Sequence, residues 1–360
     1  MTNTASEIEE ILTYYDLGQL TCHERNVRGY VNQSFTINTY AFGVNHQYFL
    51  RLYKKGIRQE ELEFEHAVIN HLAANGFDLV AAVLPTREGA TYVHLQPVSP
   101  DQEEAYYAIF DYLPGEDRYT WVAPRCNPAE IRASATVQAR FHQAISDLQP
   151  RGKRYEAPIL ELLPEIANNI ALTPLRSRQT AFDGYLLAHL DLVQKNIEQS
   201  RNALEGGDAA RLPRLVIHCD YHPGNLKFQD YNVVGMFDFD WSKVDWRCFD
   251  VALALFYFFD SWEGEADGEL RLEDVSIYLQ AYQQEFSASA GIGPLNRDEL
   301  HLLPDMISAA NLYVLNWTIE DFYHKDVDVQ EYLVFLKHGG NFIKWFEKED
   351  TRDRLVKAIG

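Results

Sequence analysis

The sequence predicts an α+β protein with two lobes: a small N-terminal lobe built on a mixed β-sheet with one helix, and a larger, mostly helical C-terminal lobe. Three observations support this prediction. Strand-like runs of β-branched and aromatic residues dominate the first hundred positions, helical spacing dominates from about Asn127, and one β-rich island at residues 215–240 interrupts the helical part. We expect residues 1–115 and 116–360 to form the two lobes.

The N-terminal lobe is predicted from a hairpin and the helix that follows it. The runs SFTINTYAF and QYFLRLY are typical of strands, and the turn GVNH between them is a hairpin signal. Residues 58–76 then carry apolar side chains at helical spacing and close with Gly76 just past the helix end. Two further strands are expected in TYVHLQPV and AYYAIFDYL, before LPGED breaks the chain.

The C-terminal lobe is predicted from repeated helical patterns. Asn127 and Pro128 are typical of a helix start, so a helix is expected to follow them. Six further segments show helical spacing: 160–168, 182–204, 251–259, 272–286, 298–322 and 329–346. Within the island, LVIH predicts a short strand, CDYHPGN a loop, and LKF and VVGMFDF two strands joined by the turn QDYN.

Charge and composition narrow the expected partners. The chain has 32 Lys and Arg against 53 Asp and Glu, a net charge of −21 that repels phosphate backbones and anionic membranes, so neither nucleic acid nor a membrane is expected as a partner. An acidic surface suits amine-bearing ligands, although solubility explains it equally well. No apolar run approaches the ~18 residues of a membrane span, and the N-terminus lacks a signal-peptide pattern, so a cytoplasmic protein is expected.

The stretch VIHCDYHPGNLKF, residues 216–228, contains the strongest functional candidates. Asp220 and Asn225 lie on the loop before the predicted hairpin and Asp238 at the far end of its second strand, so their oxygens can converge. Asn225 and Asp238 suit a hard cation such as Mg²⁺. Asp220 would then be left to orient a hydroxyl group and accept its proton. Phosphoryl transfer requires this division of roles.

Other interpretations of this stretch and of the cysteines carry less weight. His218 and His222 have the spacing of a helical zinc pair, but Pro223, Gly224 and the flanking strands disfavour a helix, and the HExxH glutamate is missing. A serine or cysteine hydrolase is disfavoured because no G-x-S-x-G occurs and because Cys219 lies at what looks like a strand end. The four cysteines form no CxxC pair, which argues against a zinc ribbon or a disulfide framework. A structural Pro-Gly turn is the remaining alternative.

The pattern H-x-D-x-x-x-x-N at residues 218–225, with Asp238 thirteen residues after Asn225, resembles the aminoglycoside phosphotransferase and choline kinase superfamily. The resemblance implies a bilobal protein-kinase-like fold, with ATP and Mg²⁺ as cofactors. It implies Asp220 as the catalytic residue, Asn225 and Asp238 as metal ligands, and His218 as support for the loop.

The resemblance also implies a nucleotide site in the first lobe. Arg51, in YFLRLY, stands where protein kinases carry a phosphate-binding lysine, and needs a glutamate partner on the next helix. Helical spacing puts both Glu61 and Glu65 in the apolar stripe of that helix, and the family pattern selects Glu65. Backbone groups near Asp111 and Leu113 would bind the adenine.

One further aspartate has two interpretations. Asp250, in FDVALALF, corresponds to a family residue that supports the catalytic loop through backbone hydrogen bonds. Capping of the predicted helix by Asp250 is an equally good account from physics alone.

Several departures from the protein-kinase pattern favour a small-molecule kinase. Gly29 is the single glycine where protein kinases carry a glycine-rich loop, and His222 replaces a lysine. Asp240 stands where D-F-G would have its glycine, and no A-P-E string occurs.

The acceptor is predicted less directly. YDLGQL, VNQSFTI, YFLRLY and HLAANGF are similar to type II homoserine kinases of this superfamily, which implies a hydroxyl on an amino acid or amino alcohol. Asp240, Trp241 and Asp245 are weak candidates for binding an amine, with packing and surface ion pairs as the alternative. A stress-response Ser/Thr protein kinase, an aminoglycoside or choline kinase, and a pseudokinase scaffold stay open. Nothing in the sequence indicates an oligomeric state.

Overall fold

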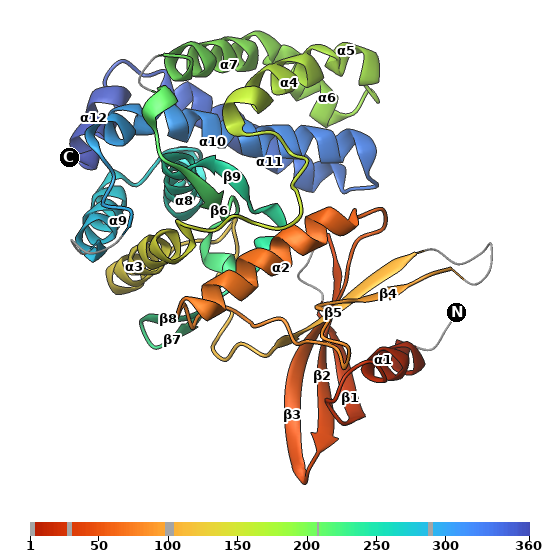
Figure 1. The fold of residues 1–360 in the computed structure, drawn as a ribbon. Helices are drawn as coiled ribbons and strands as arrows, with labels where there is room; N and C mark the ends of the chain where they lie inside the picture. Colours follow the sequence, from red (N-terminus) through yellow and green to blue (C-terminus); the bar gives the residue numbers. More distant parts are fainter. Residues whose placement is uncertain (1–3, 27–30, 98–103, 207–208, 287–290) are drawn as a thin grey trace. The chain divides into compact units, whose positions relative to one another are not determined.

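A computed structural model describes residues 4–26, 31–97, 104–206, 209–286 and 291–360 (Figure 1). Gly29 lies outside the described residues. The chain divides into two compact units. Unit 1 comprises Met1–Gly115, Gln149–Lys153 and Val234–Phe237, and unit 2 comprises Glu116–Leu148, Arg154–Val233 and Asp238–Gly360.

Unit 1 contains one five-stranded sheet and two helices. The strands are β1 (Gln19–Asn26), β2 (Gln33–Ala41), β3 (Val44–Leu52), β4 (Val93–Leu95) and β5 (Ala105–Asp111), and the helices are α1 (Thr4–Leu12) and α2 (Gln59–Ala74). The strand order is β1-β2-β3-β5-β4. All four strand pairings are antiparallel, so the expectation of a mixed sheet was wrong. The predicted α+β class is confirmed.

The turn between β2 and β3 is shorter than the sequence predicts. Ala41 pairs with Val44, so the turn consists of Phe42 and Gly43, with φ angles of 52° and 83°. Two consecutive positive φ angles are typical of the tight turns that match strand twist in a hairpin. The prediction of a turn at residues 43–46 was therefore wrong, because residues 44–46 continue the strand ladder.

Helix α2 agrees with its predicted pattern. Its buried face carries Leu62, Val68 and Leu72, and Gly76 follows the helix end with φ 75°. The positive φ explains the glycine, since other residues adopt it only at a cost. Glu65 lies on the same buried face.

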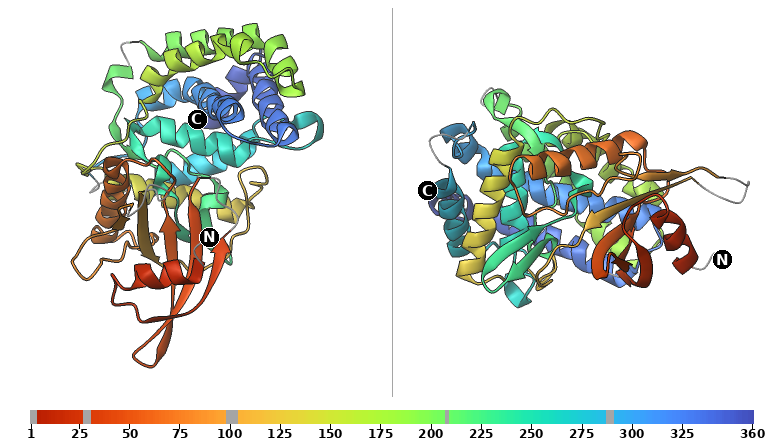
Figure 2. Two further views of the ribbon diagram at one scale, coloured as in Figure 1. Left: turned by 90° about the vertical axis from the view of Figure 1, so that its right-hand side faces the viewer. Right: turned by 60° about the horizontal axis from the view of Figure 1, so that its bottom comes forward.

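Unit 2 is mostly helical (Figure 2). Its α-helices are α3 (Pro128–Ile145), α4 (Ile159–Ala171), α5 (Thr173–Arg176), α6 (Ala181–Ala188), α7 (Leu190–Leu204), α8 (Arg247–Phe259), α9 (Leu272–Glu285), α10 (Arg297–His324), α11 (Val329–Phe346) and α12 (Thr351–Ile359). Helix α10 packs against α8 and α11, and α3 packs against α9. Helix α3 begins as predicted, with Asn127 accepting the N–H groups of Ala129 and Glu130.

The predicted helix at residues 182–204 is two helices in the structure. His189 separates α6 from α7 with φ −119° and ψ 11°. Its Nδ1 donates to the carbonyl oxygen of Tyr185 at 2.8 Å. Its backbone N–H donates instead to the carbonyl oxygen of Leu186 at 3.1 Å. The side chain thus occupies the carbonyl that an uninterrupted helix would use, and helical spacing does not reveal this competition.

The β-rich island of the sequence forms two short ladders. Strand β6 (Arg214–Ile217) pairs antiparallel with β9 (Lys243–Trp246), and β7 (Leu226–Gln229) forms a two-stranded sheet with β8 (Asn232–Met236). The predicted hairpin is confirmed, whereas β9 was not predicted. Four residues carry little strand signal by themselves, and pairing with β6 determines their conformation.

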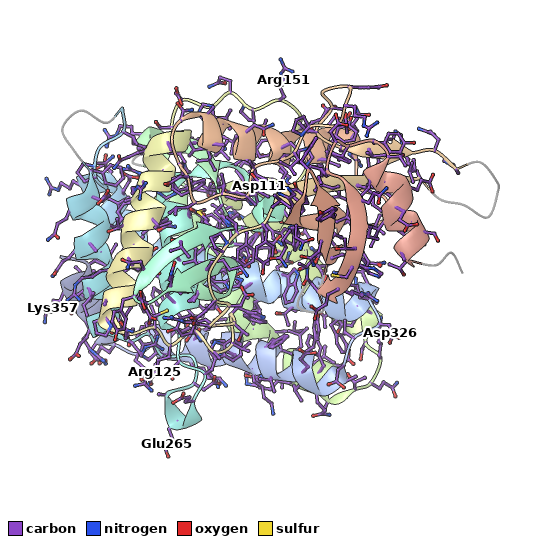
Figure 3. The ribbon with its side chains drawn as sticks, turned by 90° about the horizontal axis from the view of Figure 1, so that it is seen from below. Asp111, Arg125, Arg151, Glu265, Asp326 and Lys357 are labelled. Carbon is purple, nitrogen blue, oxygen red and sulfur yellow. The ribbon has the colours of Figure 1, made fainter. Side chains whose placement is uncertain are left out.

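Acidic side chains on the surface include those of Glu265 and Asp326, which are exposed (Figure 3). Across the part of the chain that the structure describes, no helix combines the length and the apolar character needed to cross a membrane.

One buried histidine lies between two aspartates at the C-terminal end of α8. His338 on α11 is 3% exposed, and its ring nitrogens lie 2.7 Å from Asp260 and 2.7 Å from Asp267. Its ring stacks on Trp262 with centroids 3.5 Å apart. Burial alone would lower the pKa of His338, but the two carboxylates outweigh it and raise the pKa to about 9.

This raised pKa predicts a loss of stability at alkaline pH. A group with a higher pKa in the folded state stabilises fully below its unfolded value of 6.5, and the gain disappears as pH rises through about 9. The free energy of unfolding should fall by up to about 3 kcal/mol across this window. Urea midpoints at both ends of the window measure it. His338→Gln cannot titrate there, so an equal loss in this variant would contradict the assignment.

Candidate active site

The loop between β6 and β7 is held by hydrogen bonds from several sides. Cys219 has φ 65°, a left-handed conformation that is uncommon for residues other than glycine. Its backbone N–H donates to Asp250 Oδ1 at 2.7 Å. Downstream, residues 223–225 form a single 3₁₀ turn that leads into β7. Hydrogen bonds therefore hold the loop in one defined conformation, in which the residue directly before Asp220 has a strained backbone.

Asp220 and Asn225 are joined side chain to side chain. Asn225 Nδ2 donates to Asp220 Oδ2 at 2.8 Å and to the Asp220 carbonyl oxygen at 2.9 Å. These bonds orient the Asp220 carboxylate, of which 19% of the side-chain surface stays exposed. They also direct Asn225 Oδ1 away from Asp220.

The surroundings of Asp220 raise the affinity of its carboxylate for a proton. Burial, followed by the negative charge of Asp238, raises the pKa of Asp220 well above its ordinary value. The bonds from Asn225 and Tyr257 act in the opposite direction. A raised pKa increases the proton affinity of a carboxylate, as a group that accepts a proton from a hydroxyl requires.

Asp238 lies just past β8, where it begins the 3₁₀ turn η3 (Phe239–Trp241). Its φ of 67° and ψ of 62° are left-handed, a region where aspartate and asparagine are enriched. Arg154 holds this turn by donating to the carbonyl oxygens of Phe239 and Ser242 at 3.2 and 3.0 Å. The carboxylate of Asp238 and Oδ1 of Asn225 are oxygen donors of the kind Mg²⁺ prefers, so this donor set fits the predicted metal.

The two histidines of the loop serve its backbone. His218 Nδ1 accepts the N–H of Asp220 at 3.3 Å, and His222 Nδ1 accepts the N–H of Gly224 at 3.0 Å. Burial lowers the pKa of His222 to about 3, so its ring is neutral. A Cβ atom at position 224 would lie 2.7 Å from His222 Cε1, which explains the glycine there. Among the described residues, no group of three or more side chains is placed to bind zinc.

Asp250 does not cap its helix. The first residue before α8 is Trp246, and Asp250 lies in the first turn with its side chain fully buried. Besides Cys219, the carboxylate binds Gln138 and His142 of α3 at 3.1 and 3.0 Å. The capping interpretation is therefore wrong for this residue.

The three weak substrate candidates differ in burial. Asp240 and Trp241 are half-buried on η3. Asp245 is 1% exposed, and its oxygens accept the N–H groups of Ile159 and Trp246 at 2.7 and 2.8 Å. This carboxylate therefore joins β9 to the start of α4, which favours a structural role.

In unit 1, Arg51 on β3 forms a buried ion pair with Glu65 on α2. Arg51 Nη1 donates to Glu65 Oε1 at 2.8 Å, and their side chains are 10% and 2% exposed. The guanidinium lies between 5.6 and 5.8 Å from the ring centroids of Phe49, Tyr53 and Phe110. Glu61 instead accepts the backbone N–H of Arg58 at 3.4 Å. The two glutamates therefore have different partners, and Glu65 is the one that pairs with Arg51.

Replacing Glu65 by alanine should destabilise the protein by about 3–5 kcal/mol, because it leaves Arg51 buried without this partner. Glu61→Ala, on the same helix, provides the matched control and should cost no more than about 1 kcal/mol. Equilibrium unfolding in urea measures both. An equal loss of stability in the two variants would show that the ion pair contributes no more to folding than the control residue does.

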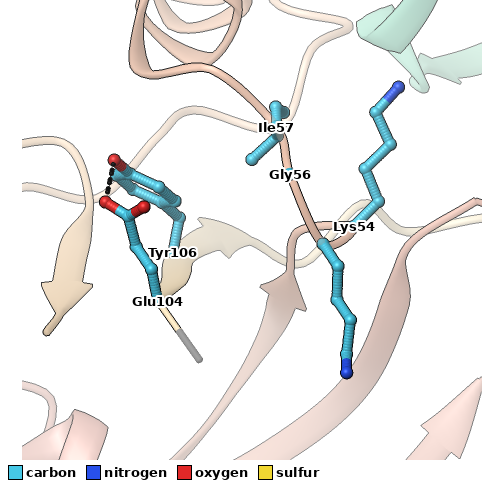
Figure 4. A pocket seen from close by; sticks show the side chains of 6 residues that line it. Lys54, Gly56, Ile57, Glu104 and Tyr106 are labelled. Atoms are coloured by element: carbon cyan, nitrogen blue, oxygen red, sulfur yellow. Dashed lines mark hydrogen bonds between the residues drawn. The ribbon is translucent and has the colours of Figure 1, made fainter. Parts of the chain in front are cut away.

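The predicted adenine contacts lie at the end of β5. The N–H of Asp111 donates to the Ala82 carbonyl oxygen at 2.9 Å, so this donor is not available to a ligand. A pocket of about 300 Å³ in unit 1 lies at the start of β5 instead, and none of the predicted residues line it (Figure 4). Its lining is Lys54, Lys55, Gly56, Ile57, Glu104 and Tyr106.

Sequence reasoning missed two side chains on α3. Gln138 and His142 are both fully buried, and both bind Asp250. Counted at 100° per residue, they fall in the middle of the apolar stripe that contains Ile131 and Ile145. A polar residue inside an apolar stripe is the signal that marked Glu65, and it marks these two residues equally well.

Comparison with known families agrees with this geometry. The family model described as "Phosphotransferase enzyme family" matches residues 24–286, most of the chain. The chain belongs to this phosphotransferase family. The protein is therefore an enzyme of the phosphate-transferring class, and the resemblance seen in the sequence is confirmed.

Individual relatives of this phosphotransferase are distant. A homoserine kinase of Xanthobacter autotrophicus is 27% identical over 319 residues, which cover 88% of this chain and 86% of that protein. A solved microcompartment-associated aminopropanol kinase has a TM-score of 0.67 at 16% identity, with 98% and 99% of the two chains covered. An amicoumacin kinase in complex with AMP-PNP and Ca²⁺ has a TM-score of 0.64 at 15% identity, with 94% and 92% covered. These likenesses confirm the kinase-like fold class.

Proposed function

We propose that the protein transfers the γ-phosphate of ATP to the hydroxyl group of a small amino acid or amino alcohol, with homoserine as the model acceptor. The observation that carries the proposal is the position of the Asp220 carboxylate. Asn225 Nδ2 orients it through a 2.8 Å hydrogen bond to Oδ2, and the negative charge of Asp238 raises its pKa. This arrangement supports the proposal because it would place a proton acceptor beside oxygens that can bind a metal, as phosphate transfer to an alcohol requires.

Each residue has a distinct part in this proposal. Asp220 orients the acceptor hydroxyl and takes its proton as the new O–P bond forms. Asn225 Oδ1 and the Asp238 carboxylate would hold Mg²⁺, which when bound supplies positive charge that compensates the phosphates. Arg51, steadied by Glu65, presents its guanidinium to the nucleotide phosphates.

The acceptor class rests on the relatives. The homoserine kinase matches nearly the whole chain, and the aminopropanol kinase acts on an amino alcohol by its name. Both acceptors combine a hydroxyl with an amine. The net charge of −21 is consistent with attraction of an amine-bearing acceptor.

An ATP-consumption screen tests the proposal. Purified protein is assayed with Mg²⁺-ATP and homoserine, aminopropanol, ethanolamine, choline or an aminoglycoside, with a generic protein substrate alongside. We expect ADP formation that depends on homoserine or a small amino alcohol. Turnover with the protein substrate alone would reject the proposal in favour of a protein kinase. The absence of any acceptor-dependent turnover would reject it in favour of a nucleotide-binding scaffold.

A further inference from the structure

Two parallel rows of buried polar side chains connect α3 and α9. Gln138 and His142 lie one turn apart on α3, and Tyr278 and Tyr282 lie one turn apart on α9. The Tyr278 hydroxyl donates to Gln138 Oε1 at 2.8 Å, and the Tyr282 hydroxyl lies 2.7 Å from His142 Nδ1. Residues at i and i+4 share a helix face, so each helix contributes one member to each row.

Both rows end on the carboxylate of Asp250. His142 Nε2 lies 3.0 Å from Oδ2, and Gln138 Nε2 lies 3.1 Å from the same oxygen. Oδ1, the other oxygen, accepts the N–H of Cys219 at 2.7 Å. One fully buried carboxylate thus joins α3 to the loop that carries Asp220.

The proton positions in the row through His142 follow from its surroundings. Burial raises the pKa of Tyr282, so its hydroxyl stays protonated and donates to Nδ1. Burial also lowers the pKa of His142, so the ring is neutral and carries its single proton on Nε2, facing Asp250. Burial alone would raise the pKa of Asp250, but the bond from His142 and its other partners lower it, so the acceptor is a carboxylate.

His142 and Gln138 hold Asp250 differently. Gln138 Nε2 is shared between Oδ2 and the backbone carbonyl oxygen of Asp250, each at 3.1 Å. His142 binds the side chain alone. The two hydrogens of the Gln138 amide group serve the backbone and the carboxylate, whereas His142 acts on the carboxylate alone and makes the shorter bond to Oδ2, 3.0 Å against 3.1 Å, so we expect His142 to restrict the rotation of the carboxylate.

The rotation of Asp250 affects the catalytic loop directly. Both oxygens belong to one rigid plane, so a turn that moves Oδ2 also moves Oδ1 away from the Cys219 N–H. Cys219 holds a left-handed conformation with φ 65°, at a cost of roughly 1–2 kcal/mol that its surroundings must offset. Loss of the Oδ1 bond would allow this residue to relax, and Asp220 is the next residue along the chain.

We propose that His142 is a positioning residue. By holding Oδ2 of Asp250, it keeps Oδ1 on the Cys219 N–H and thereby sets the direction of the Asp220 carboxylate. The kinetic consequence rests on the phosphate transfer proposed above. The structural consequence, a more mobile loop, does not.

The test compares three variants with the unmodified protein. His142→Phe keeps a ring and removes the donor, whereas His142→Gln restores an amide nitrogen near the position of Nε2. His338→Phe is the matched control, since His338 is another buried histidine bound to an aspartate at the opposite end of α8. Circular dichroism establishes the folded fraction, and hydrogen exchange is followed on peptides that cover residues 216–226.

We expect amide exchange in this loop to rise by at least about tenfold in His142→Phe and to stay near that of the unmodified protein in His142→Gln and His338→Phe. With the acceptor found in the screen, kcat of His142→Phe should fall by at least about tenfold, with KM for ATP changed less than about threefold. His142→Gln should recover most of kcat. If His142→Phe does not fold, Tyr282→Phe replaces it, and a smaller effect in the same direction is expected.

Unchanged loop exchange in the folded variant would overturn the proposal. An unchanged kcat with faster exchange would overturn it as well, since the loop would then move without consequence for catalysis. If the unmodified protein turns over no acceptor, the proposed function fails. The exchange result then decides the positioning role alone.

Discussion

Replacing Asp220 by alanine is expected to reduce acceptor-dependent phosphate transfer by roughly 10²–10⁴-fold, while binding of Mg²⁺-ATP stays close to that of the unmodified protein. The reason is the division of roles in the loop. In the proposed mechanism, Asp220 accepts the proton, whereas Asn225 and Asp238 provide the oxygens for the metal. Steady-state kinetics with the identified acceptor, together with titration of nucleotide binding, measure the two quantities separately.

A second variant separates chemistry from loop structure. Asp220→Asn keeps the size of the side chain and an oxygen that can still accept the 2.8 Å bond from Asn225 Nδ2. If the carboxylate is the proton acceptor, this variant should be nearly as impaired as Asp220→Ala. Near-normal turnover of Asp220→Asn would show that the residue supports the loop instead, and near-normal turnover of both variants would remove it from the mechanism.

Replacing Asp238 by asparagine is expected to weaken Mg²⁺-dependent nucleotide binding by at least about tenfold. Asparagine adopts the left-handed backbone conformation of this position, φ 67°, as readily as aspartate does. The substitution therefore removes charge while the turn is preserved. Asp238→Ala should show the same binding loss together with a stability cost of about 1 kcal/mol from its backbone conformation.

Nucleotide affinity measured over a range of Mg²⁺ concentrations tests this prediction. The control is Asp240→Asn, which changes the other carboxylate of the same turn and should leave the Mg²⁺ requirement unaltered. If Asp238→Asn needs no more Mg²⁺ than the unmodified protein, Asp238 is not a metal ligand. If both variants shift equally, the effect comes from net charge alone.

Local patterns predicted much of the candidate site. Asp220, Asn225 and Asp238 lie within nineteen positions of one another, on a loop and hairpin whose turns the sequence marks clearly. The apolar stripe marked both Glu61 and Glu65 as carboxylates that demand a cationic partner, and the family pattern selected Glu65. The errors are equally local in origin. The β2–β3 turn and the break at His189 depend on which backbone groups compete for a hydrogen bond, and residue spacing does not record that competition.

Two side chains that hold Asp250, Gln138 and His142, could not be predicted for a different reason. His142 lies 108 residues from Asp250 and 140 residues from Tyr282, so no short segment contains both partners. The sequence marks His142 as a polar residue on a buried face. It does not say whether a backbone carbonyl, a carboxylate or a hydroxyl satisfies it.

By itself, the sequence determined the fold class, the family and the loop with its three oxygen-bearing side chains. These depend on residue spacing and on propensities that act over a few neighbours. The tertiary structure alone decided which buried groups of α3 meet Asp250, namely Gln138 and His142. A buried polar group must find its partner wherever the packed chain brings one. That choice is made by the assembly of the whole fold.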